Sequence, residues 1–211
     1  MTNEMDEKDL VERVKLIESM MAEGRRKTES WGWTFVLWGV AYDVAIFWAA
    51  WSIKPWSWPE SLFTGNHWAW PVTMFSTAAL TMLIAMRKSA GKPNTAAGRA
   101  IASIWCSMGI SMLLLFPALS MTQRIDHHSF IAIVAAMLGL ANGACGLILR
   151  WRTELVCAVV WWAASVLACF GSEQQMMAVF LIAILVCQIV FGAYAMVLDA
   201  RRRKQHEAVH A

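Results

Sequence analysis

The sequence predicts an all-α polytopic membrane protein with six transmembrane helices, preceded by a cytoplasmic amphipathic helix. Three observations support this prediction: an apolar composition, six long apolar stretches, and an uneven distribution of lysine and arginine. Of the 211 residues, 58% are hydrophobic and 16% are charged, whereas about a quarter of a soluble domain is charged. Eight of the fifteen acidic residues lie in the first 30 positions. The remainder of the chain is therefore even poorer in charge.

Six apolar stretches are long enough, or nearly so, to cross about 30 Å of hydrocarbon as helices. They cover residues 33–53, 67–86, 100–119, 129–149, 154–171 and 176–198. The segment 87–99 contains glycine, proline and four cations, and is typical of a loop. The segment 150–153 is so short that the fourth and fifth helices must be antiparallel neighbours.

The distribution of lysine and arginine predicts the orientation, because cations stay on the cytoplasmic side of a membrane. With the N-terminus inside, sixteen of the eighteen cations are cytoplasmic, and Lys54 and Arg124 are the two outside. This predicts three parts: a cytoplasmic amphipathic helix (1–30), a six-helix transmembrane bundle (31–199) and a basic cytoplasmic tail (200–211). The expected location is a membrane, with lipid around the bundle and both termini on the cytoplasmic side. Thirteen tryptophans suit the interfacial belts of such a protein.

The N-terminal segment 4–29 has the periodicity of an amphipathic helix. Leu10, Val14, Ile17 and Met21 follow one another at alternating four- and three-residue steps and form an apolar stripe. A lipid-binding interfacial helix usually has a lysine-rich polar face, but the first half of this one is mostly acidic. The pattern therefore favours contact with a protein partner on the cytoplasmic side.

Asp43 lies near the middle of the first predicted span, where a carboxylate costs about 3 kcal/mol to insert. It is expected to face the bundle interior or a watery cavity. One interpretation is a proton or ion site; the other is a structural acid that is hydrogen-bonded within the bundle. Tyr42, Asn142 and Gln188 are the candidate partners.

The fourth span contains glycines at a spacing that allows close helix packing. Gly139 and Gly143 are four residues apart and Gly146 lies on nearly the same face, as in small-xxx-small contacts. Internal packing is favoured for a six-helix bundle, and a dimer seam remains the alternative. A homo-oligomer is therefore one option for this chain.

Several functional classes find no support in the sequence. The signatures of metalloprotease, hydrolase and phosphate-binding sites are missing, so we predict neither catalysis nor a cofactor. The adjacent Asp126, His127 and His128 are better explained as the polar start of a helix than as a metal site. The five cysteines lack close C-x-x-C spacing. The cations sit in short clusters at span ends, unlike those of a nucleic-acid-binding surface.

The order of these segments resembles a known group of proteins. An acidic leader (LVERVKLIESMMAEGRRKTESWGW), the sequence FVLWGVAY with Trp38 and Gly39, five further spans and a basic tail are similar to small uncharacterised bacterial six-helix integral membrane proteins. The resemblance implies the same fold and a location in a bacterial cytoplasmic (inner) membrane, and it supplies no catalytic residues.

Two functions follow from these features. The first is a non-catalytic accessory or regulatory membrane module that docks a partner through its N-terminal helix. The alternative is a small-solute or ion transporter, or a substrate-binding membrane subunit, that uses Asp43.

Overall fold

The computed structural model describes residues 2–51, 68–89, 96–122 and 126–210, and every regular element in these ranges is helical. Six of the helices are long and apolar enough to cross a membrane. This confirms the predicted all-helical class and the six apolar helices. The elements are α1 (Thr2–Ser30), α2 (Gly32–Trp51), α4 (Ala69–Ser89), α5 (Ala96–Thr122), α6 (His127–Leu149), α7 (Arg152–Phe170), α8 (Glu173–Ile184), η1 (Leu185–Val190) and α9 (Phe191–His210).

The helices α6 and α7 form the most extensive contact in the described structure. They are joined by a turn in which Arg150 adopts the left-handed conformation, with φ 48° and ψ 42°. A Cβ added to Gly139 would lie 2.4 Å from Cδ1 of Trp162, and one added to Gly143 would lie 3.0 Å from the same indole. The flat ring of Trp162 therefore packs directly on glycine backbone. Gly146 meets Leu155 in the same way.

The sixth apolar stretch is a helix with a change of pitch in its middle. Helix α8 begins with a capping box formed by Ser172 and Gln175, and continues through the π-helical segment η1 into α9. A π-helical turn adds a residue and re-aims the side chains around it. Here it turns Gln188 and Ile189 onto Gly39 of α2, where a Cβ would lie 2.9 Å from each.

The helices α2 and α9 cross at two glycines. A Cβ on Gly32 would lie 2.7 Å from the carbonyl oxygen of Gly192, and one on Gly192 would lie 2.7 Å from that of Gly32. At these positions the two backbones touch, and only glycine, which has no side chain, allows helices to approach so closely. Because α2 also packs on α4 and on η1, this crossing fixes the first span against the last.

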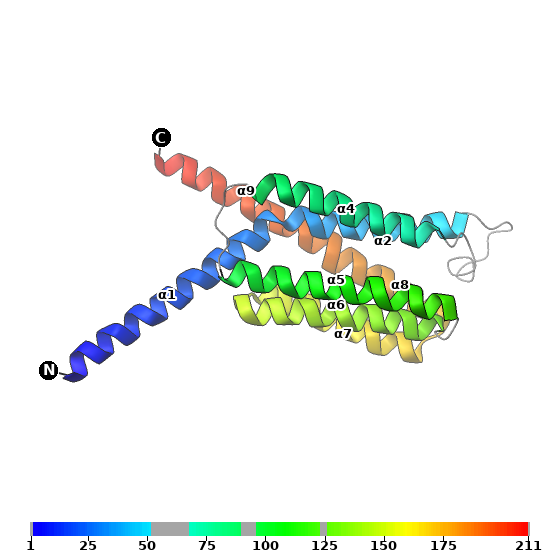
Figure 1. Ribbon diagram of the computed structural model, residues 1–211, viewed down its shortest axis with the longest axis horizontal. Helices are drawn as coiled ribbons and strands as arrows, with labels where there is room; N and C mark the ends of the chain where they lie inside the picture. Colours follow the sequence, from blue (N-terminus) through cyan, green and yellow to red (C-terminus); the bar gives the residue numbers. More distant parts are fainter. Residues whose placement is uncertain (1, 52–67, 90–95, 123–125, 211) are drawn as a thin grey trace.

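The remaining helices, α4 and α5, lie at the periphery. Helix α4 packs on α2, whereas α5 packs on α6 and α1. Their apolar side chains are largely exposed, as expected for surfaces in contact with lipid. At one end of the bundle α1 extends away from the other helices, and α9 leaves at the same end (Figure 1). We call this the arm end.

Candidate functional site

Helix α1 divides into an exposed part and a part that is attached to the bundle. Leu10, Val14 and Ile17, three residues of the predicted stripe, are 64%, 50% and 55% exposed. Met21, the fourth, is half-buried. We call residues 9–19 the arm and residues 20–30 the anchor. The arm points away from the bundle (Figure 1), so its apolar stripe is uncovered.

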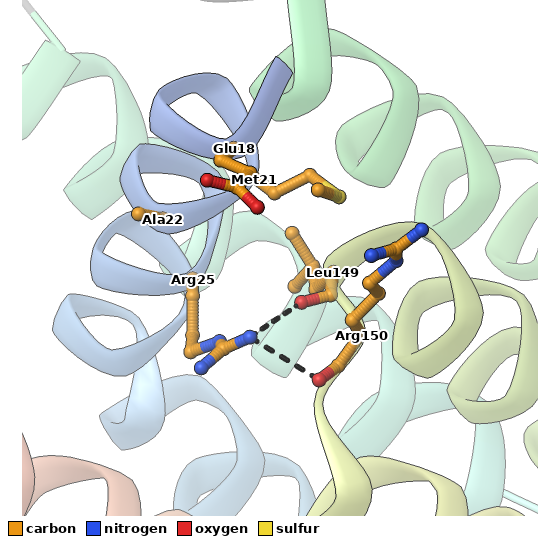
Figure 2. Close-up of a pocket in the computed structure, with 6 residues that line it drawn as sticks. All are labelled: Glu18, Met21, Ala22, Arg25, Leu149 and Arg150. Atoms are coloured by element: carbon orange, nitrogen blue, oxygen red, sulfur yellow. Dashed lines mark hydrogen bonds between the residues drawn. The ribbon is translucent and has the colours of Figure 1, made fainter. Parts of the chain in front are cut away.

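The anchor is held at the turn between α6 and α7. Arg25 donates from Nη2 to the carbonyl oxygens of Leu149 at 2.8 Å and Arg150 at 3.2 Å (Figure 2). Gly24 lies one position away, and a Cβ there would approach a methyl group of Leu149 to 2.8 Å. A glycine therefore lets α1 come close enough for the guanidinium to reach both carbonyls.

This contact suits the end of α6 chemically. The last carbonyls of a helix have no partner within the helix, and a cation there also interacts favourably with the helix dipole. The left-handed conformation of Arg150 costs about 1–2 kcal/mol for a residue with a side chain. Hydrogen bonds from a charged donor contribute about 1.5–3 kcal/mol each. The bonds from Arg25 are therefore large enough to offset the strain in the turn.

A second contact joins the anchor to the last helix. The Glu29 side chain is 1% exposed, and its carboxylate forms an ion pair with Arg202 of α9, with N–O distances of 2.9 and 3.0 Å. Burial raises the pKa of Glu29, and the charges of Arg202 and Arg25 oppose that rise. The last turn of α1 and helix α9 thus meet through a buried carboxylate that needs its cation.

An open pocket of about 220 Å³ lies where the arm meets the anchor. Its walls come from α1 and from the α6–α7 turn: Glu18, Met21, Ala22, Arg25, Leu149 and Arg150 (Figure 2). Apolar and charged groups are mixed in it, and the Arg150 guanidinium points away from the two hydrogen-bonded carbonyls (Figure 2). The pocket is a crevice beneath the base of the arm.

Glu154 is the most unusual acid in the described structure. It lies in the first turn of α7 and is 0% exposed, and neither carboxylate oxygen has a hydrogen-bonding partner. The thiols of Cys145 and Cys157 are the titratable groups that interact with it electrostatically. Cys157 in turn accepts a hydrogen bond at its carbonyl oxygen from the Cys187 thiol, at 3.6 Å. Glu154 thus interacts with the thiols of Cys145 and Cys157, and the thiol of Cys187 contacts the backbone of Cys157.

The structure places Asp43 at the edge of the buried face of α2, where it is half-buried. Within the described residues its carboxylate has no hydrogen bond or ion pair, and the three candidate partners have other contacts. Tyr42 packs against the rings of Trp38, Trp70 and Phe180. Asn142 donates to the carbonyl oxygen of Leu138 at 2.9 Å, and Gln188 packs on Gly39. No described contact brings these polar groups together around Asp43.

The polar cluster at the start of α6 acts as a helix cap. Asp126 is the N-cap, and its carboxylate accepts hydrogen bonds from the backbone N–H and the hydroxyl of Ser129 at 2.7 and 2.9 Å. These bonds lower the pKa of Asp126. Nδ1 of His128 lies 2.7 Å from the carbonyl oxygen of Ala168. Within the described ranges, no group of three or more His, Cys, Asp or Glu residues is arranged to hold a metal ion.

Sequence reasoning missed the residues that join the arm to the bundle. Arg25, Glu29 and Arg202 appear in the sequence as ordinary charges at the ends of helices. In the sequence, Glu154 is the first residue of the fifth predicted stretch, 154–171, next to the short segment 150–153. The one available signal was that an acid lies within the first turn of an apolar helix, which does not reveal burial.

Comparison with protein-family models, with curated proteins and with solved structures found no match to this chain.

Proposed function

We propose that this protein is a non-catalytic accessory or regulatory membrane module with both termini in the cytoplasm, which docks a protein partner through the arm. The carrying observation is the exposure of Leu10, Val14 and Ile17 on a helix whose other half is fixed to the bundle. A helix that is anchored at one end presents its free end in one orientation. Exposed apolar stripes of this kind normally mark contacts.

The charge of the segment 1–23, which includes the arm, points to the chemistry of the partner. Residues 1–23 contain seven acidic and three basic residues, a net charge of −4. Anionic lipid headgroups would repel this segment. A protein groove or helix with an apolar strip and basic flanks is complementary to it. Such a partner would bind the stripe and its acidic borders together.

The transporter alternative has less support. It needs polar groups that converge on Asp43, and the described contacts of Tyr42, Asn142 and Gln188 lead elsewhere. We therefore do not propose transport.

We expect a photo-crosslinker at Ile17 to capture one cytoplasmic protein in native membranes. Leu10→Glu should abolish this adduct, because it puts a charge in the stripe. Ser19→Glu should retain it: the same charge is added about 180° around the helix from the stripe, at 100° per residue. The captured protein, once purified, should bind the full-length chain, and added salt should weaken that binding because part of it is charge pairing.

Three results would contradict docking through the stripe. They are an adduct that survives Leu10→Glu, capture of lipid alone, and capture of only a second copy of this chain. The last would instead indicate a homo-oligomer.

Both termini are expected to be cytoplasmic. The test uses a background in which the exposed Cys106 and Cys169 are changed to alanine. A membrane-impermeant thiol reagent added outside intact cells should then label Ser172→Cys and leave Lys204→Cys unlabelled. These positions lie at opposite ends of the helix pair α8–α9, and both are exposed. Labelling of Lys204→Cys alone would reverse the proposed orientation.

A further inference from the structure

Within the part of the chain that the structure describes, Glu154 is buried without an ion-pair or hydrogen-bonding partner. The residue is 0% exposed, both carboxylate oxygens lack hydrogen-bonding partners, and none of the described ion pairs includes it. A buried, unpaired carboxylate costs several kcal/mol. The N-terminus of α7 favours the anion by about 0.3–1 kcal/mol, or about 2 at most. Desolvation is the larger effect, so the carboxyl is neutral in this packing.

The groups that face Glu154 do not change this balance. From α6 and from its own helix they are the thiols of Cys145 and Cys157, and from η1 Cys187 bonds to the backbone of Cys157. The nearby cations point elsewhere: Arg150 and Arg152 are exposed, and Arg25 of α1 is bonded to the carbonyls of the α6–α7 turn. The described titratable groups that interact with Glu154 are therefore thiols, and none of them is a cation.

Glu154 is also joined to the anchor through very few residues. The backbone N–H of Trp151 donates to the carbonyl oxygen of Gly146 at 2.9 Å. The backbone N–H of Leu155, the residue after Glu154, donates to the carbonyl oxygen of Trp151 at 3.2 Å, and its side chain packs on Gly146. Arg25 bonds to the carbonyl oxygen of Arg150, directly before Trp151. A charged Glu154 would need water around it. The first turn of α7, which carries Glu154, follows the carbonyls of Leu149 and Arg150 that Arg25 binds, so a movement of this turn that admits water would shift those carbonyls.

We propose that Glu154 is a proton-binding site at the arm end: with its proton bound the α6–α7 turn closes and holds the anchor, and loss of the proton releases it. The ligand is the proton alone, which enters or leaves the carboxyl oxygen in exchange with water. This inference goes beyond docking through the arm and does not depend on it, because the proton site can exist whether or not a partner binds.

Infrared difference spectra of the full-length protein in lipid, recorded over a pH series, test the site directly. We expect the carbonyl band of a protonated carboxylic acid to persist at pH values where exposed carboxylates are ionised. Glu154→Gln should remove this band, whereas Asp43→Asn and Glu29→Gln should keep it. If Glu154→Gln does not fold, isotope-labelled glutamate assigns the band. The label shifts the band of a glutamate and leaves that of Asp43 unchanged, and a shifted band that persists in Glu29→Gln does not come from Glu29.

Trypsin cleavage after Arg25 tests the coupling to the anchor. In the wild type, cleavage should become several-fold faster as pH rises through the titration of the band. In Glu154→Gln, which cannot ionise at this position, only the pH dependence of trypsin and of Glu29 remains. The wild-type cleavage rate divided by that of the variant should therefore rise several-fold over the same range. The proposal is overturned if no glutamate band is present in the folded protein, or if cleavage at Arg25 follows pH equally in both proteins.

Discussion

Gly192→Leu should prevent the bundle from closing. A Cβ at this position would lie 2.7 Å from the carbonyl oxygen of Gly32 and 2.9 Å from the backbone nitrogen of Val36. Both atoms belong to the backbone of α2, so no side chain can rotate away, and α2 and α9 must separate. Overpacking usually costs about 1–3 kcal/mol, and we expect more than about 3 here because an entire helix crossing is lost. Thermal unfolding in detergent and the yield of monodisperse protein measure this loss.

Gly109→Leu is the matched control. No heavy atom lies within 4 Å of a Cβ at Gly109, which is in the peripheral α5. Leucine also has a higher helix propensity than glycine, by about 0.8 kcal/mol. We expect Gly109→Leu to be neutral or slightly stabilising. Equal stability of the two variants would show that the Gly32–Gly192 crossing is not needed for the fold.

Arg202→Ala should detach the anchor. It leaves the carboxylate of Glu29, 1% exposed, without its ion-pair partner. Breaking a fully buried pair costs about 3–5 kcal/mol; because Arg202 is 45% exposed, solvent screening reduces the expected loss to about 2–3 kcal/mol. Hydrogen exchange of the amides in residues 20–30 reports the free energy of this local opening.

The free energy of opening the anchor, measured by the same hydrogen exchange, depends on pH in a direction that the burial of Glu29 determines. Burial raises the pKa of Glu29 in the folded protein, so the attached anchor binds the proton more tightly than the detached one. Attachment is therefore strongest below the ordinary pKa of the group and weakens as pH rises through the raised value. The loss caused by Arg202→Ala should shrink on acidification, since a neutral Glu29 does not need the cation.

Arg203→Ala serves as the control for Arg202→Ala. Arg203 pairs with Asp199 at 2.8 Å on the exposed side of α9, where its side chain is 69% exposed. Such pairs contribute about 0–1 kcal/mol, so the exchange of residues 20–30 should hardly change. Equal effects of the two arginine variants would contradict a specific role for Glu29.

The sequence was sufficient to predict the apolar helices, because each depends on a local run of residues. It could not reveal contacts between distant segments. Arg25 binds the carbonyl of Leu149, 124 residues away, and its chemistry is that of any cation near a helix end. The burial of Glu154 depends on what packs over the first turn of α7. The π-helical turn at Gln188 has no counterpart in the hydropathy pattern, which is continuous there.

The candidate site was predicted in part for the same reason. The exposed stripe of Leu10, Val14 and Ile17 follows from periodicity alone. Asp43 stood out in the sequence because a charge in an apolar run is conspicuous. Glu154 is more deeply buried, but it begins an apolar stretch next to a polar segment, where an acid is not conspicuous. Hydropathy detects unusual composition and does not measure depth.

The contacts of α2 and of the anchor with α9 also bear on biosynthesis. The backbone of α2 closely approaches that of α9 at Gly32 and Gly192, and Glu29 is joined to a residue 173 positions later. A ribosome must therefore synthesise the chain through Arg202 before the anchor can form its ion pair. Contacts of such large sequence separation form late, and the segments that are synthesised first stay exposed until then. A nascent or truncated chain would present the anchor, Gly32 and Gly39 uncovered, which distinguishes an unfinished molecule from a finished one to the quality-control machinery of the cell.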